Sequence, residues 1–342
     1  MSINLGYVRG NVSNHQDYVI FSEVHSQSLE KINVACCATK FEKNNFWDKG
    51  KIRQRSYVDI EDIISGEFDI LDVSEFYRDY SQSILSKFNG KKSVTVFDNL
   101  PFGISGGNAG ALSANADLII ARTAMIKNML LLEGVPDEKI QIIPSAVDTT
   151  YFKPGINTGN NNIVLFCGRL APEKGLWDLI VAMTGLKAEL HVAGEGDIRP
   201  YQTLASKCKV NMKYHGKIEY SGLASFYRSG SILVVPSIPK IDAYNPANSW
   251  VEQFGMVILE GMSTGLPVIC SDTGSARDIF GVTKAGLLFP PRAWDILRDQ
   301  IVMLLNNSAM RNELGGKALR RANSTFSTLN VGRLLAEAYS EL

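Results

Sequence analysis

Residues 249–280 read SWVEQFGMVILEGMSTGLPVICSDTGSARDIF, and this stretch decides the fold. An apolar, periodic segment opens at residues 254–255, runs through Glu260 and stops at the Gly-Leu-Pro of residues 265–267, which predicts an α-helix. The apolar residues 267–270 follow directly and predict a buried strand. A helix followed by a buried strand is the repeating step of an α/β domain.

Two carboxylates flank the first turns of this predicted helix. Glu252 lies at the junction of loop and helix, and Glu260 lies on the helix itself. A helix N-terminus offers backbone N–H groups and the positive end of the macrodipole to an anion. Ionised carboxylates only accept hydrogen bonds, with two oxygens each, which suits the hydroxyl groups of a ribose or another sugar. The combination predicts a nucleotide-sugar site.

Alternating strand and helix patterns extend from this stretch toward both termini. In the second half, strand patterns at 163–167, 189–193, 212–215 and 232–235 alternate with helix patterns at 175–184, 198–207 and 222–228. In the first half, strand-like and helix-like segments lie at 3–8, 15–29, 32–38, 74–88, 93–97, 117–121, 122–133 and 139–143. This alternation favours parallel sheets covered on both faces, with ligands at the carboxyl ends of the strands. The predicted fold class is α/β, with two doubly wound, Rossmann-like domains facing a cleft.

The length of 342 residues exceeds what one hydrophobic core usually supports, so two domains are expected. Pro154, Gly155 and an Asn/Gly-rich run interrupt the periodicity at residues 149–162. We place an N-terminal domain at residues 1–155 and a C-terminal domain, which carries the predicted nucleotide-sugar site, at residues 156–327. The tail from Trp294 onward is predicted to be helical.

The composition, with 45% hydrophobic and 20% charged residues, is that of an ordinary globular protein. Lysine plus arginine and aspartate plus glutamate balance at 35 each, which gives no support to a nucleic-acid partner. No apolar run reaches the roughly 18 residues of a membrane span, and no signal-peptide layout is present. We expect a cytoplasmic location, and peripheral membrane contact for a lipid-linked acceptor stays open.

No metal or cofactor is expected. The five cysteines, at positions 36, 37, 167, 208 and 270, lack a Cys-x2-Cys spacing, so we interpret them as small buried side chains of a reducing compartment. Asp69 and Asp72 are close in sequence, but a loop edge explains them more simply than a metal site does.

The glutamate pair resembles a known family. Glu252 and Glu260, with seven residues between them, match the pair of the retaining glycosyltransferases of family 4, or glycosyl transferases group 1, which have the GT-B fold. The surrounding EQFGMVILEGM and GLPVI are similar to that family's pattern, and FCGRLAPEKG at residues 166–175 is a second match. Gly194-Glu195-Gly196, which follows a predicted strand, resembles the family's glycine turn near the nucleotide, and an ordinary turn is the alternative interpretation. The resemblance implies that a C-terminal helix, at about residues 328–342, packs back on the first domain.

The resemblance also implies a role for each matched residue. Arg169 and Lys174 would stabilise the departing nucleoside diphosphate, where charge grows in the transition state. Glu252 would read the sugar hydroxyls and Glu260 the ribose. The remaining expected contacts are the backbone amides of Phe254, Gly255, Met256 and Val257, the loop glycines Gly10 and Gly168, and the main chain at Lys217. Gly10 follows the strand at 3–8, and a plain tight turn is its alternative interpretation.

The main departure from the family lies at residues 94–101, VTVFDNLP. Many members carry a histidine at the end of this strand, whereas this chain has Phe97 and Asp98 there. Asp98 could bind a sugar hydroxyl or assist the acceptor's proton transfer, and a turn or helix-cap role is the alternative. The acceptor site is expected in the first domain, around residues 9–14, 40–51 and 99–110.

The sequence predicts a metal-independent retaining glycosyltransferase with a nucleotide-sugar donor (UDP-, GDP- or ADP-sugar) and an unidentified acceptor. Two other functions stay open, a nucleotide-sugar epimerase of the same architecture and a catalytically silent nucleotide-sugar-binding protein. A Rossmann dehydrogenase is disfavoured, because the first strand lacks Gly-x-Gly-x-x-Gly and the acidic residue that follows it.

Overall fold

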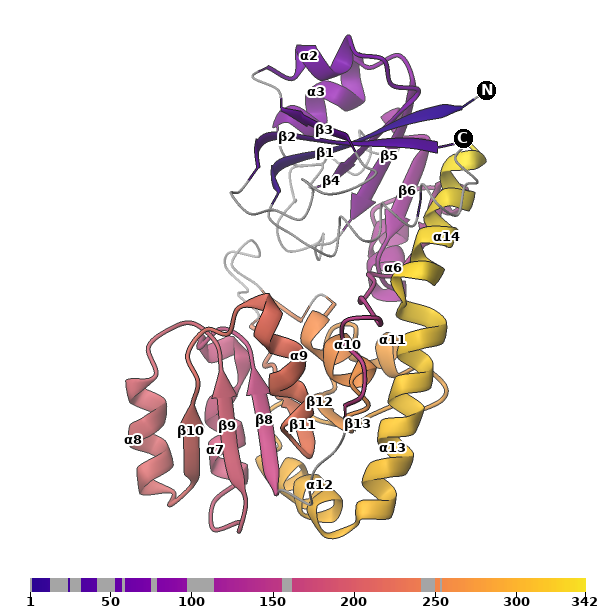
Figure 1. Cartoon of the computed structure of the whole chain (residues 1–342). Helices are drawn as coiled ribbons and strands as arrows, with labels where there is room; N and C mark the ends of the chain where they lie inside the picture. The colour runs from indigo at the N-terminus through magenta and orange to yellow at the C-terminus, as the bar shows by residue number, and fades with distance from the viewer. Residues whose placement is uncertain are drawn as a thin grey trace. The chain divides into compact units, whose positions relative to one another are not determined.

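The computed structural model describes residues 2–12, 24, 32–41, 53–56, 59–74, 79–96, 114–155, 162–240, 250–252 and 254–342. These residues form two compact units, each with its own sheet (Figure 1). The first unit contains the described residues up to Asp148 together with Ser327–Leu342, and the second contains those from Thr149 to Phe326. The division thus falls a few residues before position 155, because Phe152 is fully buried in the second unit.

The first unit is built on a seven-stranded parallel sheet of order β3-β2-β1-β4-β5-β6-β7. Its strands are β1 (Ile3–Val12), β2 (Ile32–Phe41), β3 (Arg53–Ser56), β4 (Ile70–Ser74), β5 (Lys91–Val96), β6 (Leu118–Ala121) and β7 (Ile140–Ile142). Its described helices are α2 (Glu61–Ile64), α3 (Asp79–Lys87), α6 (Ala124–Leu132), the 3-10 helix η2 (Asp137–Lys139) and α14 (Thr328–Ser340). This is a doubly wound α/β architecture, as the sequence predicts.

The last helix, α14, supplies part of the core of this first unit. Its buried residues Val331, Leu335 and Tyr339 pack in one cluster with Leu5 of β1 and Ile70 of β4. The Ser327 hydroxyl caps the helix by accepting from the Asn330 N–H at 3.2 Å. The N-terminal unit is therefore completed by the C-terminal end of the chain.

Asp72 is not at a loop edge, and that prediction is wrong. It lies inside β4 and is fully buried. Its carboxylate accepts hydrogen bonds from Ser93 Oγ at 2.6 Å, Thr95 Oγ1 at 3.0 Å and, from α14, Tyr339 Oη at 3.1 Å. Burial raises the pKa of Asp72, and these hydrogen bonds and the charge of Arg122 oppose the rise.

The expectation of a loop at Gly10 is also wrong, because β1 continues through Val12. The neighbouring β2 extends to Phe41, and the parallel register still pairs Asn11 with Lys40. Pairing with β2 keeps this segment extended beyond the short apolar run that the sequence shows.

The second unit has a six-stranded parallel sheet of order β10-β9-β8-β11-β12-β13. Its strands are β8 (Ile163–Cys167), β9 (Glu189–Ala193), β10 (Asn211–Tyr214), β11 (Ile232–Val235), β12 (Val268–Ser271) and β13 (Leu287–Phe289). Its helices are η3 (Pro172–Lys174), α7 (Leu176–Ala182), α8 (Arg199–Lys207), α9 (Tyr220–Arg228), α10 (Met256–Ser263), α11 (Ala276–Phe280), α12 (Trp294–Asn306), α13 (Ser308–Arg321) and the π-helical turn η5 (Ala322–Phe326). The predicted helix and strand at residues 254–270 are α10 and β12.

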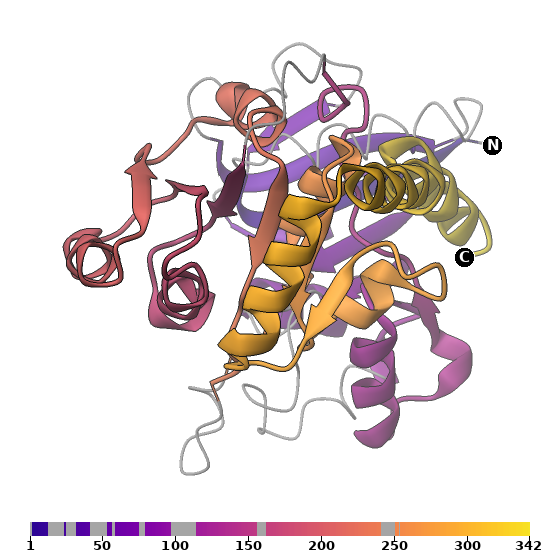
Figure 2. The same ribbon diagram turned by 90° about the horizontal axis from the view of Figure 1, so that it is seen from below.

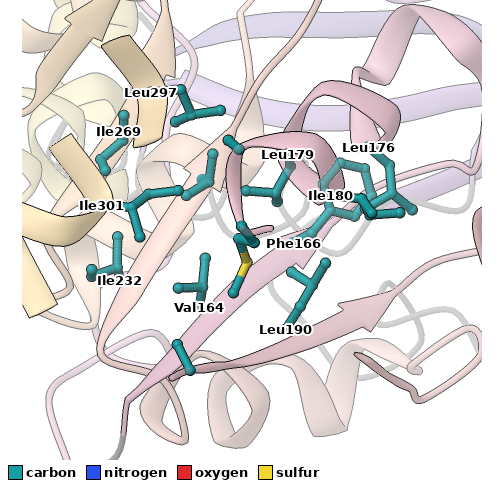
Figure 3. Close-up of a cluster of buried hydrophobic side chains, with 14 of the residues drawn as sticks. Val164, Phe166, Leu176, Leu179, Ile180, Leu190, Ile232, Ile269, Leu297 and Ile301 are labelled. Atoms are coloured by element: carbon teal, nitrogen blue, oxygen red, sulfur yellow. The ribbon is translucent and has the colours of Figure 1, made fainter. Parts of the chain in front are cut away.

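One face of this sheet is covered by α7 and α12. Figure 3 shows strand residues such as Phe166 and Ile269 meeting Leu179 of α7 and Leu297 of α12. Figure 2 shows α12 lying along the strands of the sheet. Continuous burial of this kind is typical of a parallel sheet covered by helices. No helix in the described part of the chain is long and apolar enough to cross a membrane.

Candidate active site

The carboxyl ends of the strands in the second unit bring the predicted site residues to one sheet edge. Arg169 and Lys174 follow β8, and Ser237 follows β11. Glu252 lies in the segment between β11 and α10. All these strands run parallel, so their carboxyl ends share an edge, where doubly wound folds bind ligands.

Lys174 and Glu252 form the centre of the candidate site. Lys174 ends the short helix η3, and its Nζ donates to Glu252 Oε2 at 2.7 Å. The two side chains are 19% and 14% exposed, so the pair is largely shielded from water. Ser237 Oγ donates to the same oxygen at 2.7 Å, and Lys174 Nζ lies 4.6 Å from the centre of the Trp250 ring. Sequence reasoning predicted the cation and the carboxylate at one site.

Two glycines allow the close backbone packing that positions this pair. Gly175 has φ +71° and Gly274 has φ +56°, conformations that residues with a Cβ rarely adopt. A Cβ on Gly175 would overlap the Pro236 carbonyl, and a Cβ on Gly274 would overlap the Glu252 carbonyl. The segments that carry Lys174 and Glu252 are therefore held by backbone contacts that require glycine.

Helix α10 begins beside this pair. Its N-cap residue is Gly255, in the left-handed conformation, and among the described residues no side chain caps the helix. A Cβ built on Gly255 would lie 3.5 Å from Glu252 Cγ, so the helix N-terminus and this carboxylate are neighbours. Met256 and Val257, in the first turn, are partly exposed. The first-turn N–H groups can therefore serve an anion placed next to Lys174.

Glu260 is buried further than its predicted place at the border of the site suggests. It is 7% exposed and accepts a hydrogen bond from Tyr227 Oη at 2.6 Å. Burial raises the pKa of Glu260 to about 7, and the bond from Tyr227 opposes the rise. Cys167, at the end of β8, lies beside Tyr227, and burial raises the pKa of its thiol to about 12. Glu260 belongs to this buried group and, among the described residues, makes no direct contact with Lys174.

Arg169 lies at the exposed rim. Its side chain is 63% exposed, and its guanidinium donates to Glu173 Oε1 at 3.1 Å. Its loop is fixed from both sides, since Gly168 N donates to Ala193 O at 3.0 Å and Leu170 N donates to Glu195 O at 2.7 Å. The guanidinium can swing toward a ligand while the backbone stays in place.

The glycine turn at residues 194–196 therefore supports the Arg169 loop. Lys217 Nζ lies 3.5 Å from Glu195 Oε2, and both side chains are largely exposed.

Phe254 is half-buried, with its ring 6.1 Å from that of Phe326. Gly10 lies in β1 of the first unit, and Asp98 lies outside the described residues.

Three residues of this site were missed by sequence reasoning, namely Ser237, Trp250 and Tyr227. Trp250 stands two positions before Glu252, so its place in the motif could have suggested it. Ser237 and Tyr227 carry no local signal, because their roles depend on which strands and helices are neighbours. Within the described ranges, no cluster of His, Cys, Asp and Glu side chains could hold a metal ion.

Comparisons with known proteins identify the family of the chain. The family model for glycosyl transferases group 1 matches residues 147–321. An uncharacterised glycosyltransferase of Methanocaldococcus jannaschii is 30% identical over 234 residues, which are 67% of this chain and 61% of the relative. A phosphatidyl-myo-inositol mannosyltransferase of Mycobacterium leprae is 29% identical over 167 residues, which are 46% of this chain and 42% of the relative. The matches thus span less than two thirds of either relative.

Solved structures share the fold over the whole chain. The HepE protein of Anabaena, in complex with UDP, has a TM-score of 0.82 at 15% identity, covering 99% of this chain and all of that one (100%). A glycosyltransferase from Rickettsia africae also has a TM-score of 0.82, at 17% identity, covering 99% and 98% of the two chains. At such identities the likeness is one of fold, and the fold is GT-B.

Proposed function

The chain belongs to the glycosyl transferases group 1, and we propose that it is a retaining enzyme that transfers a sugar from a nucleoside diphosphate sugar to an acceptor hydroxyl without a metal ion. The observation that carries this proposal is the contact of Lys174 with Glu252 beside the N-terminus of α10. A cation, a carboxylate and a helix N-terminus in one place suit a ligand that joins a diphosphate to a sugar. The complexes of Anabaena HepE with UDP and with UDP-glucose give a precedent for such a donor on this fold.

The donor would interact with three parts of the site. Its diphosphate would bind between Lys174, the α10 amides and the exposed Arg169 guanidinium. Glu252 would accept hydrogen bonds from the transferred sugar, and Glu260 from the ribose. The loop at Gly168 and the main chain at Lys217 would complete the nucleotide site. From the first domain, we propose that Asp98 binds a sugar or acceptor hydroxyl.

Lys174 and Arg169 would do the catalytic work by stabilising charge on the leaving group. When the bond between the anomeric carbon and the diphosphate oxygen breaks, that oxygen gains negative charge, and a fixed cation then binds more strongly than in the ground state. The acceptor oxygen would bond to the same face of the anomeric carbon. Its proton would pass to the departing phosphate oxygen, so that no separate protein base is needed.

For the acceptor, we propose only a chemical class. Two relatives are named for mannosyl transfer to phosphatidyl-myo-inositol and for glycosyl transfer to D-inositol 3-phosphate. We therefore propose to screen polyhydroxylated, inositol-like acceptors first, both free and lipid-linked. A cytoplasmic location with peripheral membrane contact would fit a lipid-linked acceptor.

The decisive experiment is a donor screen with the full chain. UDP-, GDP- and ADP-sugars are incubated with the protein, with and without an acceptor extract, and binding, donor hydrolysis and the anomeric configuration of products are measured. We expect one nucleotide class to bind and its sugar to be transferred with retention, at undiminished rate in the presence of EDTA. No binding of any nucleoside diphosphate would contradict the proposal. A sugar isomerised without acceptor would indicate an epimerase, and tight donor binding without transfer to any acceptor extract would indicate a silent binding protein.

A further inference from the structure

Tyr227 and Glu260 form a buried hydrogen bond between the neighbouring helices α9 and α10 (Figure 1). The phenol hydroxyl donates to Oε2 at 2.6 Å, and Tyr227 is fully buried. A bond from a hydroxyl to a carboxylate is short and directional when the carboxylate is ionised. Tyr227 therefore fixes how the carboxylate of Glu260 is turned.

The second oxygen of Glu260 is left available. The described residues donate no other hydrogen bond to Glu260. Its Oε1 is not one of the polar atoms that are buried from solvent without a hydrogen-bond partner. One oxygen is thus held by the protein, and the other can accept from a ligand hydroxyl. A carboxylate held at one oxygen loses less rotational freedom when the other binds.

The phenol ring is itself held rigidly. Its centre lies 6.0 Å from the ring of Phe152, which is fully buried, and 6.0 Å from the ring of Phe226. Both contacts are tilted or edge-on, at 62° and 63°, as aromatic pairs prefer. Tyr227 can therefore hold the Glu260 carboxylate in a fixed position.

We propose that Tyr227 is a positioning residue that holds Oε2 of Glu260 and so aims Oε1 at a ribose hydroxyl of the donor, which makes the protein select ribonucleotides over deoxyribonucleotides. This inference rests on the proposed function, in which Glu260 binds the ribose. It adds the residue that gives Glu260 its selectivity, and this residue lies on a different helix.

The same hydrogen bond controls the ionisation of Glu260. Burial raises the pKa of Glu260, and the bond from Tyr227 lowers it again. The titratable groups that face Glu260 are Tyr227 on α9 and Cys167 at the end of β8, and both stay neutral near pH 7 because burial raises their pKa values. From the described parts of β11, β12, α13 and η5, which also pack on α10, no charge acts on Glu260. Loss of the phenol hydroxyl should therefore move the ionisation of Glu260 to higher pH.

The test is calorimetric titration of the full chain with UDP, GDP and ADP, followed by the 2′-deoxy and 3′-deoxy forms of whichever binds best, between pH 6 and pH 8.5. We expect the ribonucleotide to bind the wild type at least about tenfold more tightly than one of its deoxy forms. In Tyr227→Phe, this ratio should fall severalfold, and the pH midpoint of ribonucleotide binding should rise. An unchanged ratio together with an unchanged midpoint would overturn the proposal.

The matched control is Tyr151→Phe, which removes another phenol hydroxyl of the second unit, one that donates to Tyr220 O at 2.9 Å. It should change neither the ratio nor the midpoint, and an equal effect in both variants would reduce Tyr227 to a structural role. If Tyr227→Phe does not fold, Tyr227→3-fluorotyrosine keeps the shape, and its more acidic hydroxyl should lower the midpoint. A wild type that binds no nucleoside diphosphate contradicts the proposed function itself, whereas binding without discrimination contradicts only the role of Tyr227.

Discussion

Lys174 Nζ donates to Glu252 Oε2 at 2.7 Å, although 78 positions separate the two residues in the sequence. The two side chains form an ion pair that is largely shielded from water. A donor that bridges phosphate and sugar can satisfy both at once, the phosphate at Lys174 and the sugar hydroxyls at Glu252. In the proposed function, the pair would therefore contact two parts of one donor.

Replacement of Lys174 by alanine should abolish most of the turnover. The lost cation would no longer stabilise the leaving diphosphate, and the removal of one such group typically lowers the rate about 100-fold or more. Initial rates with the donor found in the screen measure the effect. Lys317→Ala is a suitable control, since Lys317 forms an exposed pair with Glu313 at 2.7 Å in the same unit. Turnover within a factor of about two of wild type would remove Lys174 from the mechanism.

Gly274→Ala should displace Glu252 and lower both stability and activity. The added Cβ would overlap the Glu252 carbonyl, so the backbone would have to move. This cost adds to the roughly 1 kcal/mol that any side chain costs at positive φ. Gly185→Ala measures the cost of positive φ alone, because Gly185 has φ +72° with open space around its Cβ position. Thermal unfolding and turnover should both be affected clearly more by Gly274→Ala. Equal melting temperatures for the two variants would contradict the close packing at Glu252.

Stability should depend on pH through Glu260. Its folded-state pKa of about 7 lies above the usual 4.5, so the folded state holds this proton more tightly than the unfolded state does. The contribution is fully present below pH 4.5, and it is lost as pH rises through 7, by an amount on the order of 3 kcal/mol at most. Denaturant unfolding at pH 5 and pH 8 should show a smaller loss in Glu260→Gln than in wild type. The same slope in both proteins would exclude Glu260 as its source.

Tyr339→Phe should loosen α14 from the first unit. The variant leaves the buried carboxylate of Asp72 without one of its donors, which costs about 1–3 kcal/mol. Hydrogen exchange in residues 328–340 should become faster while exchange in α10 stays unchanged. Tyr80→Phe, which removes a longer bond of 3.3 Å to Ser74 O, should have a smaller effect. Unchanged protection of α14 would show that its apolar contacts alone hold it.

The sequence predicted those parts of the fold that depend on local pattern. Residues 163–167 and 254–270 form the expected strands and helix, because a buried parallel strand is an apolar run and a helix has caps and breakers. The strand β3 was missed because its four residues, RQRS, are polar, as is typical of a sheet edge. The short strand β13 was also missed.

Pairings between distant segments could be predicted only where a family motif supplied them. The family motif predicted that Lys174 and Glu252 lie at one site. The hydrogen bond from Tyr227 to Glu260 and the burial of Asp72 under Tyr339 follow from which helices are neighbours, and a single sequence does not contain that information. A carboxylate inside an apolar strand also violates the usual preference for uncharged interiors, so its most natural interpretation was a loop.

Helix α14, whose Val331, Leu335 and Tyr339 complete the first unit, also has a consequence for biosynthesis. A ribosome that has made the chain up to Phe326 has delivered every residue of the second unit, while the first, begun earlier, still lacks its last helix. The first unit must therefore wait, with part of its apolar surface uncovered, until residues 327–342 have also been synthesised and have left the ribosome. A nascent polypeptide truncated before Ser327 is accordingly the species that we expect chaperones to retain.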